Sequence, residues 1–173
     1  MPFIEITTRE AIPDEKKAVL AQALSDTMLN IEIGGPTDAA CTRDWIWFRV
    51  IPAGDWAIGG RFDETYRRGR SMCLARIIAP EGFMNAELKL RAIAEVTADI
   101  RAALEISSAD DGTGIWVHLT EIPEGQWGAA GEPTPLLSLI EGMGGTVSDK
   151  RLDEINAHFA GADRLRKDYG IPG

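Results

Sequence analysis

Residues 52–60 read Pro52-Ala53-Gly54-Asp55-Trp56-Ala57-Ile58-Gly59-Gly60, and residues 123–131 read Pro123-Glu124-Gly125-Gln126-Trp127-Gly128-Ala129-Ala130-Gly131. Both stretches fit the pattern Pro-x-Gly-x-Trp-x-x-x-Gly, and their tryptophans are 71 residues apart (127 − 56). The same offset places Trp116 on Trp45 and Cys73 on Pro2. Identities that recur at one offset favour an internal duplication of a unit that ends in this turn.

The first unit is predicted to be strand, helix, strand and turn. Residues 3–8 are β-branched, aromatic and alternating, as in a strand. Pro13 and the acids after it predict the start of a helix, which ends at Gly34-Gly35-Pro36. Its apolar face is expected to hold Leu20, Leu24, Met28 and Ile31. Residues 44–51 predict a strand with Ile46, Phe48 and Val50 on one face and Trp45, Trp47 and Arg49 on the other. Residues 52–60 predict a short hairpin.

The same order of elements recurs in the second unit. We expect a strand over residues 71–79, a helix over 84–105 and a strand over 115–120. The apolar face of the helix is expected to hold Leu90, Ile93, Val96, Ile100 and Leu104. The predicted units are therefore 1–60 and 71–131, joined by a charged, glycine-containing connector at 61–70.

These units predict an α/β (α+β) fold in one structural domain. Parallel strands joined by a helix need a right-handed crossover, so two units can form a four-stranded sheet with both helices on one face. Residues 132–173 are expected to be a C-terminal extension. It should contain a short helix from about Asp149, with Leu152, Ile155 and Phe159 on one side.

The other face of the predicted sheet is rich in aromatic side chains. It is expected to carry Trp45, Trp47, Arg49, Trp116, His118 and Thr120. A face of this kind is poorly suited to water, so we expect another layer or subunit to cover it.

Charge and cysteine content narrow the possible partners. The 173-residue chain has 18 Lys and Arg against 27 Asp and Glu, a formal net charge of −9. Such a surface repels phosphate backbones, so we expect neither nucleic acid nor a membrane as partner. The chain contains two cysteines and no long apolar run, and its first residues form a predicted strand, so we expect a cytoplasmic protein. It shows no metal-ligand spacing, phosphate loop or dinucleotide motif, so we expect neither a metal nor a cofactor.

A strand that begins Met1-Pro2, a helix that begins near Asp14-Glu15-Lys16-Lys17 and a strand that leads to Gly-x-Trp-x-x-Gly-Gly together resemble the tautomerase superfamily. The two units and the extension are similar to the longer branch, that of cis-3-chloroacrylic acid dehalogenase and malonate semialdehyde decarboxylase. The resemblance covers residues 2–131 and implies a homotrimer.

The resemblance also implies a catalytic residue, Pro2. Once Met1 is removed, the nitrogen of Pro2 is a secondary amine that can act as general base or, protonated, as general acid. An apolar pocket lowers the pKa of such an amine. Trp56 and Trp127 correspond to the aromatic wall of the family's site. His118 falls at a strand tyrosine of the longer branch, so we expect it to act as a second catalytic residue that hydrogen-bonds and orients a small carboxylate or carbonyl substrate.

The sequence departs from the family at the positions of its arginines and its acid. The arginine positions of short members read Ile12 and Trp45, and the stretch that carries the arginine pair of the longer branch, 79–83, contains no arginine. The position of the longer branch's helix histidine falls near Met28. The position of that branch's water-activating acid falls near Ala129, and Glu132 is the nearest carboxylate in this sequence. Arg49 and Arg76, both on predicted strands, are the candidates for a relocated anion site.

Three hypotheses follow. The first is a tautomerase or isomerase that acts on a small enolisable carbonyl acid. The second is a hydrolytic dehalogenase, hydratase or decarboxylase, and the third is a non-catalytic trimer that kept only the fold. Structural roles also stay open: Pro2 as a strand start, Arg49 and Arg76 in ion pairs, His118 at an interface, the tryptophans in packing, and Cys73 as a small buried residue.

Overall fold

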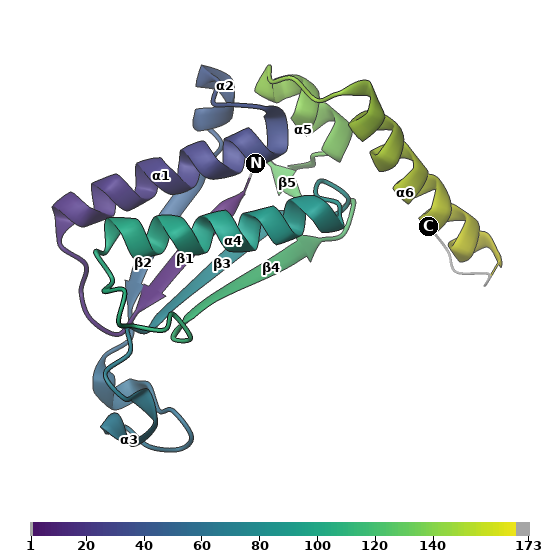
Figure 1. Ribbon diagram of the computed structural model, residues 1–173. Helices are drawn as coiled ribbons and strands as arrows, with labels where there is room; N and C mark the ends of the chain where they lie inside the picture. The colour runs from purple at the N-terminus through teal and green to yellow at the C-terminus, as the bar shows by residue number, and fades with distance from the viewer. Residues whose placement is uncertain (1, 169–173) are drawn as a thin grey trace.

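The computed structural model describes residues 2–168, with the side chains of all but residues 165, 166 and 168. A four-stranded sheet in the order β2-β1-β3-β4 forms one layer, and helices α1 and α4 lie side by side across one of its faces (Figure 1). β1 is parallel to β2 and β3 is parallel to β4, whereas β1 and β3 are antiparallel. The predicted fold of tandem β-α-β units is therefore confirmed. Its elements are β1 (Phe3–Thr8), α1 (Asp14–Ile33), β2 (Trp45–Val50), β3 (Cys73–Pro80), α4 (Ala86–Ala103) and β4 (Ile115–Ile122).

The strand register repeats at the offset found in the sequence. Phe3 pairs with Trp45 in the first unit, and Leu74 pairs with Trp116 in the second, each 71 residues further along (74 − 3 and 116 − 45). Because β1 and β3 are antiparallel, the two units begin at opposite ends of the sheet. We call these the Pro2 end, where β1 begins, and the Cys73 end, where β3 begins.

The core lies between the sheet and the two helices. Ile4 and Ile6 of β1 are fully buried, and the predicted apolar face of α1 is confirmed, since Leu20, Leu24, Met28 and Ile31 are all buried. The first helix ends at Gly34, whose φ of +79° is readily adopted by glycine and lets the backbone N–H cap the helix.

The predicted face of the second helix is partly wrong. Leu90 is 70% exposed and Ile93 40% exposed, whereas the buried residues of α4 are Ala92, Val96, Ile100 and Ala103. The helix is rotated so that its alanines face the core beside α1. A prediction from large apolar residues alone misses this, because small side chains also fill buried positions where elements pack closely.

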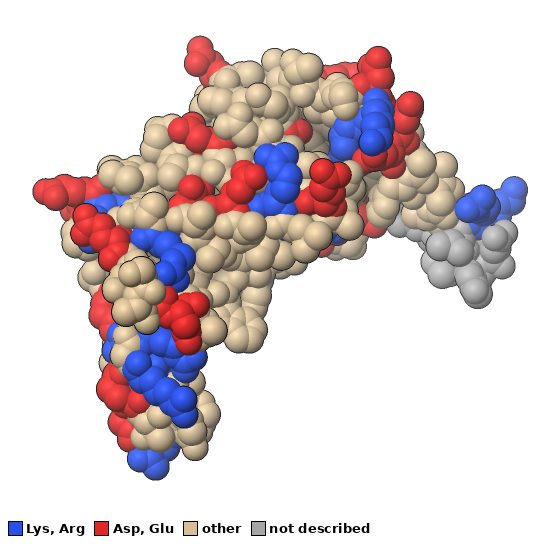
Figure 2. All heavy atoms as spheres, in the orientation of Figure 1, with Lys and Arg blue, Asp and Glu red and all other residues tan. Residues whose placement is uncertain are grey.

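The segment between the two units forms a small lobe at the Cys73 end, which we call the connector lobe (residues 53–70). It contains η1 (Ala53–Asp55) and α3 (Glu64–Arg67) and projects beyond the sheet (Figure 1). The hairpin predicted at 52–60 is reduced to one bridge between Ile58 and Arg61. Lys and Arg side chains gather on this lobe, at the lower end of the molecule in Figure 2.

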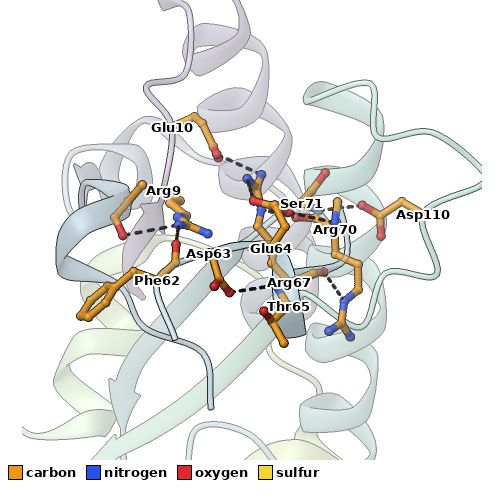
Figure 3. A network of polar contacts seen from close by, with 12 residues as sticks. Arg9, Glu10, Phe62, Asp63, Glu64, Thr65, Arg67, Arg70, Ser71 and Asp110 are labelled. Atoms are coloured by element: carbon orange, nitrogen blue, oxygen red, sulfur yellow. Dashed lines mark hydrogen bonds and ion pairs between the residues drawn. The ribbon is translucent and has the colours of Figure 1, made fainter. Parts of the chain in front are cut away.

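Buried and partly buried arginines attach the connector lobe to the sheet. Arg9, only 6% exposed, donates a hydrogen bond of 2.7 Å to the carbonyl of Phe62. Arg67 pairs with Glu10 at 2.9 Å and with Glu64 at 3.0 Å (Figure 3). The lobe is therefore joined to the residues that follow β1.

The extension packs against the Pro2 end. Its elements are α5 (Leu136–Met143) and α6 (Asp149–Asp168), which follow a short hairpin of β5 (Gly128–Ala129) and β6 (Glu132–Pro133); a further short helix, α2 (Asp38–Cys41), precedes β2. The helix predicted from Asp149 is confirmed, and Ile155 is fully buried while Leu152 and Phe159 pack beside it. Helix α5 is not predicted by the sequence analysis. No helix among the described residues is long and apolar enough to span a membrane.

Candidate active site

Pro2 is buried immediately before β1, and aromatic rings surround the residue that follows it. The ring of Phe3 stacks on Trp45, with centroids 5.2 Å apart and planes at 18°. It also lies 4.9 Å from the ring of Trp127, which is 8% exposed. The structure thus brings Trp127, one of the two predicted wall residues, to the Pro2 end of the same chain.

Two carboxyl groups lie at this end of the sheet. Because Phe3 pairs with Trp45, Asp44 lies level with Pro2 on the neighbouring strand. Glu32, in the last turn of α1, is 5% exposed, and burial raises its pKa; the charge of Asp44 raises it further. Burial also raises the pKa of Asp44, while a hydrogen bond with Ser25 lowers it. The carboxyl group of Asp44 is therefore close enough to influence the protonation of Glu32.

Neither acid is among the site residues predicted from the sequence, although the sequence contains a signal for one of them. Leu20, Leu24 and Met28 recur every four residues along the buried face of α1, and Glu32 is the next residue in that series. A carboxyl group on a buried helix face is costly to ionise, so it is a candidate for function. Asp44 carried no comparable signal, because it lies just before a strand where acids are ordinary.

The extension closes the Pro2 end. Leu136 and Met143 of α5 are fully buried in one cluster with Leu29 and Ile33 of α1, and the ring of Phe3 packs against that cluster. The backbone of Gly145 passes so close to α1 that a Cβ there would lie 2.5 Å from the Cβ of Ile33. The extension therefore covers the end of α1 and packs against Phe3, the residue that follows Pro2.

An arginine of the extension reaches the stretch where the family's longer branch has its arginine pair. Arg151 of α6 donates hydrogen bonds of 2.6 Å and 2.7 Å to the carbonyls of Gly82 and Phe83 and pairs with Glu154 at 2.8 Å. These bonds fix the loop after β3 to the extension. The residue lies outside the part of the sequence that resembles the family, and the sequence analysis did not single it out.

Arg49 and Arg76 meet at Glu5, on the sheet face opposite the helices. Their guanidinium groups lie 3.4 Å and 3.3 Å from the carboxylate of Glu5, whose side chain is 8% exposed. The two arginines themselves are exposed, at 61% and 44% of the side chain. Within one chain, the structure therefore brings both candidates to a common acid and not to Pro2.

His118 and Trp56 lie apart from Pro2. They line a cavity of about 370 Å³ at the Cys73 end, together with Cys73 and Trp116. Burial raises the pKa of the Cys73 thiol to about 12, so this thiol is neutral at physiological pH and a poor nucleophile. The predicted cooperation of His118 with Pro2 is thus not seen within a single chain.

The structure also locates three residues at or near site positions of the family: Ile12, Met28 and Glu132. Ile12 and Met28 are buried in the core, and Glu132 lies exposed on β6. Among the described residues, no group of His, Cys, Asp and Glu is arranged to hold a metal ion.

A four-stranded sheet of two β-α-β units, with a buried proline at the start of its first strand, defines the tautomerase fold, and comparison with solved structures supports this assignment. No family model and no curated protein matches the chain. A member of the cis-3-chloroacrylic acid dehalogenase (cis-CaaD) family matches with a TM-score of 0.61 and 20% identity over 90% of this chain and 99% of that chain. A fused 4-OT, described as a symmetric trimer, gives 0.61 and 22% over 79% and 98%. An FG41 malonate semialdehyde decarboxylase gives 0.53 and 16% over 75% and 91%.

These structures agree with the predicted resemblance to the tautomerase superfamily, including its longer branch. At such low identity the likeness concerns the fold.

Proposed function

We propose that the chain is an enzyme in which the amine of Pro2, set free by removal of Met1, transfers a proton on a small enolisable carbonyl acid. The observation that supports this most is the buried position of Pro2 at the start of β1, at the end of the sheet where Asp44 lies level with it and Glu32 is buried. Structural neighbours described as a fused 4-OT, a malonate semialdehyde decarboxylase and a member of the cis-3-chloroacrylic acid dehalogenase family favour an enzyme of this class.

The surroundings act on the Pro2 amine in opposite directions. The rings of Phe3 and Trp127 make the site apolar, which favours the neutral amine and lowers its pKa. An ionised carboxylate at Glu32 or Asp44 favours the ammonium and raises it. A proton can therefore be held either by the amine or by a carboxyl group. This suits a tautomerisation, in which one group takes a proton from the substrate and returns it at another atom.

A second candidate function is the addition of water to an unsaturated or 3-halogenated acid. The specific observation in its favour is the carboxyl pair, because a carboxylate can activate water, and the expected acid near Ala129 is absent. In this reaction the hydroxyl of water bonds to C3, the ammonium of Pro2 gives its proton to C2, and the carboxyl group receives the proton lost by the water. A 3-halo adduct then loses halide from C3 while its hydroxyl gives up a proton to solvent, which leaves an aldehyde at C3.

We further propose that the protein works as a homotrimer. The sheet face opposite the helices exposes Trp45 by 60% and Trp116 by 61%, and burial of these rings would stabilise an assembly. Fused 4-OT neighbours are described as trimers. In such an assembly Arg49 and Arg76 lie on the shared face, where they could bind a carboxylate substrate. Light scattering tests this directly, and a monomer would contradict it.

The decisive experiment compares two residues at equivalent positions. Intact mass first establishes whether Met1 is removed. The protein is then assayed for ketonisation of phenylenolpyruvate and 2-hydroxymuconate and for halide release from 3-haloacrylates. We expect Pro2→Ala to lower the rate by about 10²–10⁴-fold, the usual contribution of a general acid–base group. Cys73→Ala, at the duplicated position, should leave it unchanged.

The outcomes separate the three hypotheses. Activity only on the enol acids supports a tautomerase, and halide release supports the hydrating enzyme. Activity that survives Pro2→Ala would contradict proton transfer by the Pro2 amine. A chain that retains Met1 and is inactive on every substrate supports a non-catalytic trimer.

A further inference from the structure

The cavity at the Cys73 end has a shape that the duplication explains. It is bounded by the turn after β2, the start of β3 and the outer face of β4. Its volume of about 370 Å³ is lined chiefly by Trp56, Cys73, Leu74, Trp116 and His118. Leu74 and the rings of Trp56 and Trp116 make the cavity largely apolar, whereas the Cys73 side chain is buried in the core on the helix side of the sheet.

The equivalent place at the Pro2 end is filled by a ring. There Phe3 stacks on Trp45 and contacts Trp127. The 71-residue offset converts these two tryptophans into Trp116 and Trp56. It converts Phe3 into Leu74, whose side chain is smaller and not aromatic. Among the described residues, no ring contact joins Trp56 to Trp116, and the cavity lies where such a ring would be.

The walls of this cavity are held in position. The indole N–H of Trp116 donates a hydrogen bond of 3.1 Å to the carbonyl of Thr113, which fixes the ring although it is 61% exposed. His118 lies edge-on to Trp116, with centroids 6.3 Å apart and planes at 84°. Gly114, buried beside the cavity, has its Cα so close to the carbonyl of Ser71 that a Cβ would lie 2.2 Å from that oxygen. An ordered aromatic wall loses little freedom when a ligand binds.

We propose that the Cys73 end binds a small planar aromatic molecule of one ring, in the place that Phe3 occupies at the Pro2 end. The ring stacks on Trp116 and contacts Trp56, while a polar substituent at the open side hydrogen-bonds His118. A neutral ligand is favoured, because the chain carries a net charge of −9. This site is separate from Pro2, and the inference does not depend on the proton-transfer chemistry. It requires that, in the proposed homotrimer, the side of the Trp116 ring that faces the cavity stays open to solvent.

The experiment uses the full-length protein labelled with ¹⁵N at its five tryptophans, whose indole N–H signals are assigned by single Trp→Phe variants. Benzyl alcohol is the probe, because it has one ring, no charge and one hydroxyl. We expect saturable shifts of the Trp56 and Trp116 signals and none of Trp45 or Trp127. The dissociation constant should be on the order of millimolar, because so small a ligand makes few contacts.

A variant that restores the missing ring provides the sharpest control. Leu74→Phe should place its own ring on Trp116 and weaken binding by at least about tenfold. Leu74→Met keeps an aliphatic side chain and should bind as the wild type does. If Leu74→Phe does not fold, Trp116→Leu, at an exposed position, serves instead and should also lose binding. The proposal is overturned if benzyl alcohol causes no saturable shift in the wild type, as when a second copy covers the cavity, or if binding survives the loss of the cavity in Leu74→Phe or of the ring in Trp116→Leu.

Discussion

The two ends of the sheet are built on one sequence pattern and differ in what fills it. At the Pro2 end the ring of Phe3 lies between Trp45 and Trp127, and two acids, Glu32 and Asp44, lie at the same end of the sheet. At the Cys73 end there is a cavity. The 71-residue offset puts Ala103 and Ile115 where Glu32 and Asp44 stand, so the acids occur in the first unit only.

A physical constraint accounts for this difference. A chain has a single N-terminus, so only the first unit can begin with a free amine. The backbone nitrogen of Cys73 is an amide, and its N–H donates a hydrogen bond of 3.1 Å to the carbonyl of Gly114. The second unit therefore cannot perform amine chemistry, whatever side chain it carries. Acids near it would have no ammonium to act on, and apolar residues occupy their positions.

The largest difference in stability between the two ends should come from truncating Phe3, which pairs with Trp45, and Leu74, which pairs with Trp116. Phe3→Ala removes the ring from between Trp45 and Trp127 and should destabilise the protein by about 3 kcal/mol, at the low end for a phenylalanine because Phe3 is only partly buried. Leu74→Ala enlarges a cavity that is already open and should cost about 1–2 kcal/mol, less than a fully buried leucine. Urea unfolding at one fixed protein concentration measures both. Equal losses would contradict the contrast drawn between the two ends.

A smaller effect, confined to the Pro2 end, is expected from Gly145→Val. The new Cβ would lie 2.5 Å from the Cβ of Ile33, so α5 must shift away from α1, at a cost of about 1–3 kcal/mol. Hydrogen exchange should accelerate over residues 136–143 and remain unchanged around β3.

Gly142→Ala is the matched control. Its Cβ meets the nearest atom, of Arg43, at 3.7 Å, an ordinary contact, and alanine favours the helix in which Gly142 lies. Faster exchange in both variants would mean that α5 is sensitive to any change and not to this clash.

The extent to which the sequence predicts this molecule depends on how local each feature is. Periodicity and one repeated turn predict the two units and the buried face of α1. They also predict that the strand of Trp45 lies in one unit with the strand of Phe3. The orientation of α4 and the presence of α5 are not predicted, because alanines and a short apolar helix give weak signals. The candidate site is predictable in part. Pro2 and Trp127 lie at one end of the sheet, whereas Glu32 is brought to that end only because the last turn of α1 packs there.

The buried acid at the Pro2 end, Glu32, makes the free energy of unfolding depend on pH. Burial raises the pKa of Glu32 above its ordinary value of 4.5, so the folded state holds this proton more tightly than the unfolded state does. The resulting stabilisation is fully present below about pH 4.5 and is lost as the pH rises through the raised pKa. Glu32→Gln removes this contribution. Since the lowered pKa values of exposed acids such as Asp63 act in the opposite direction, the informative quantity is the difference between variant and wild type.

We expect that difference in unfolding free energy to grow in favour of Glu32→Gln as the pH rises from 4.5 towards 8. A matched substitution, Glu87→Gln, changes an exposed acid at the start of α4 and should leave the profile unchanged. Urea unfolding across this pH range measures both. A Glu32→Gln profile parallel to that of the wild type would show that Glu32 keeps the same proton in both states.

The smallest effect is expected where the two units face each other. Glu5 and Arg76 are equivalent under the 71-residue offset, and they are also direct partners across β1 and β3, 3.3 Å apart. In an exact duplicate this position would set two identical side chains against each other, and two like charges there repel. Opposite charges at the contact between the copies remove that repulsion, and they also distinguish the first unit from the second. Arg76→Gln should cost less than about 1 kcal/mol, because the arginine is 44% exposed and Arg49 still pairs with Glu5.

Arg76→Glu should cost more than Arg76→Gln, because it sets two carboxylates against each other while Glu5 is largely buried. The reversed pair, Glu5→Arg with Arg76→Glu, should recover part of the loss, and a double-mutant cycle measures the coupling. If the single charge reversal is no worse than Arg76→Gln, then the charges at this contact are incidental and the difference between the units resides only at the two ends.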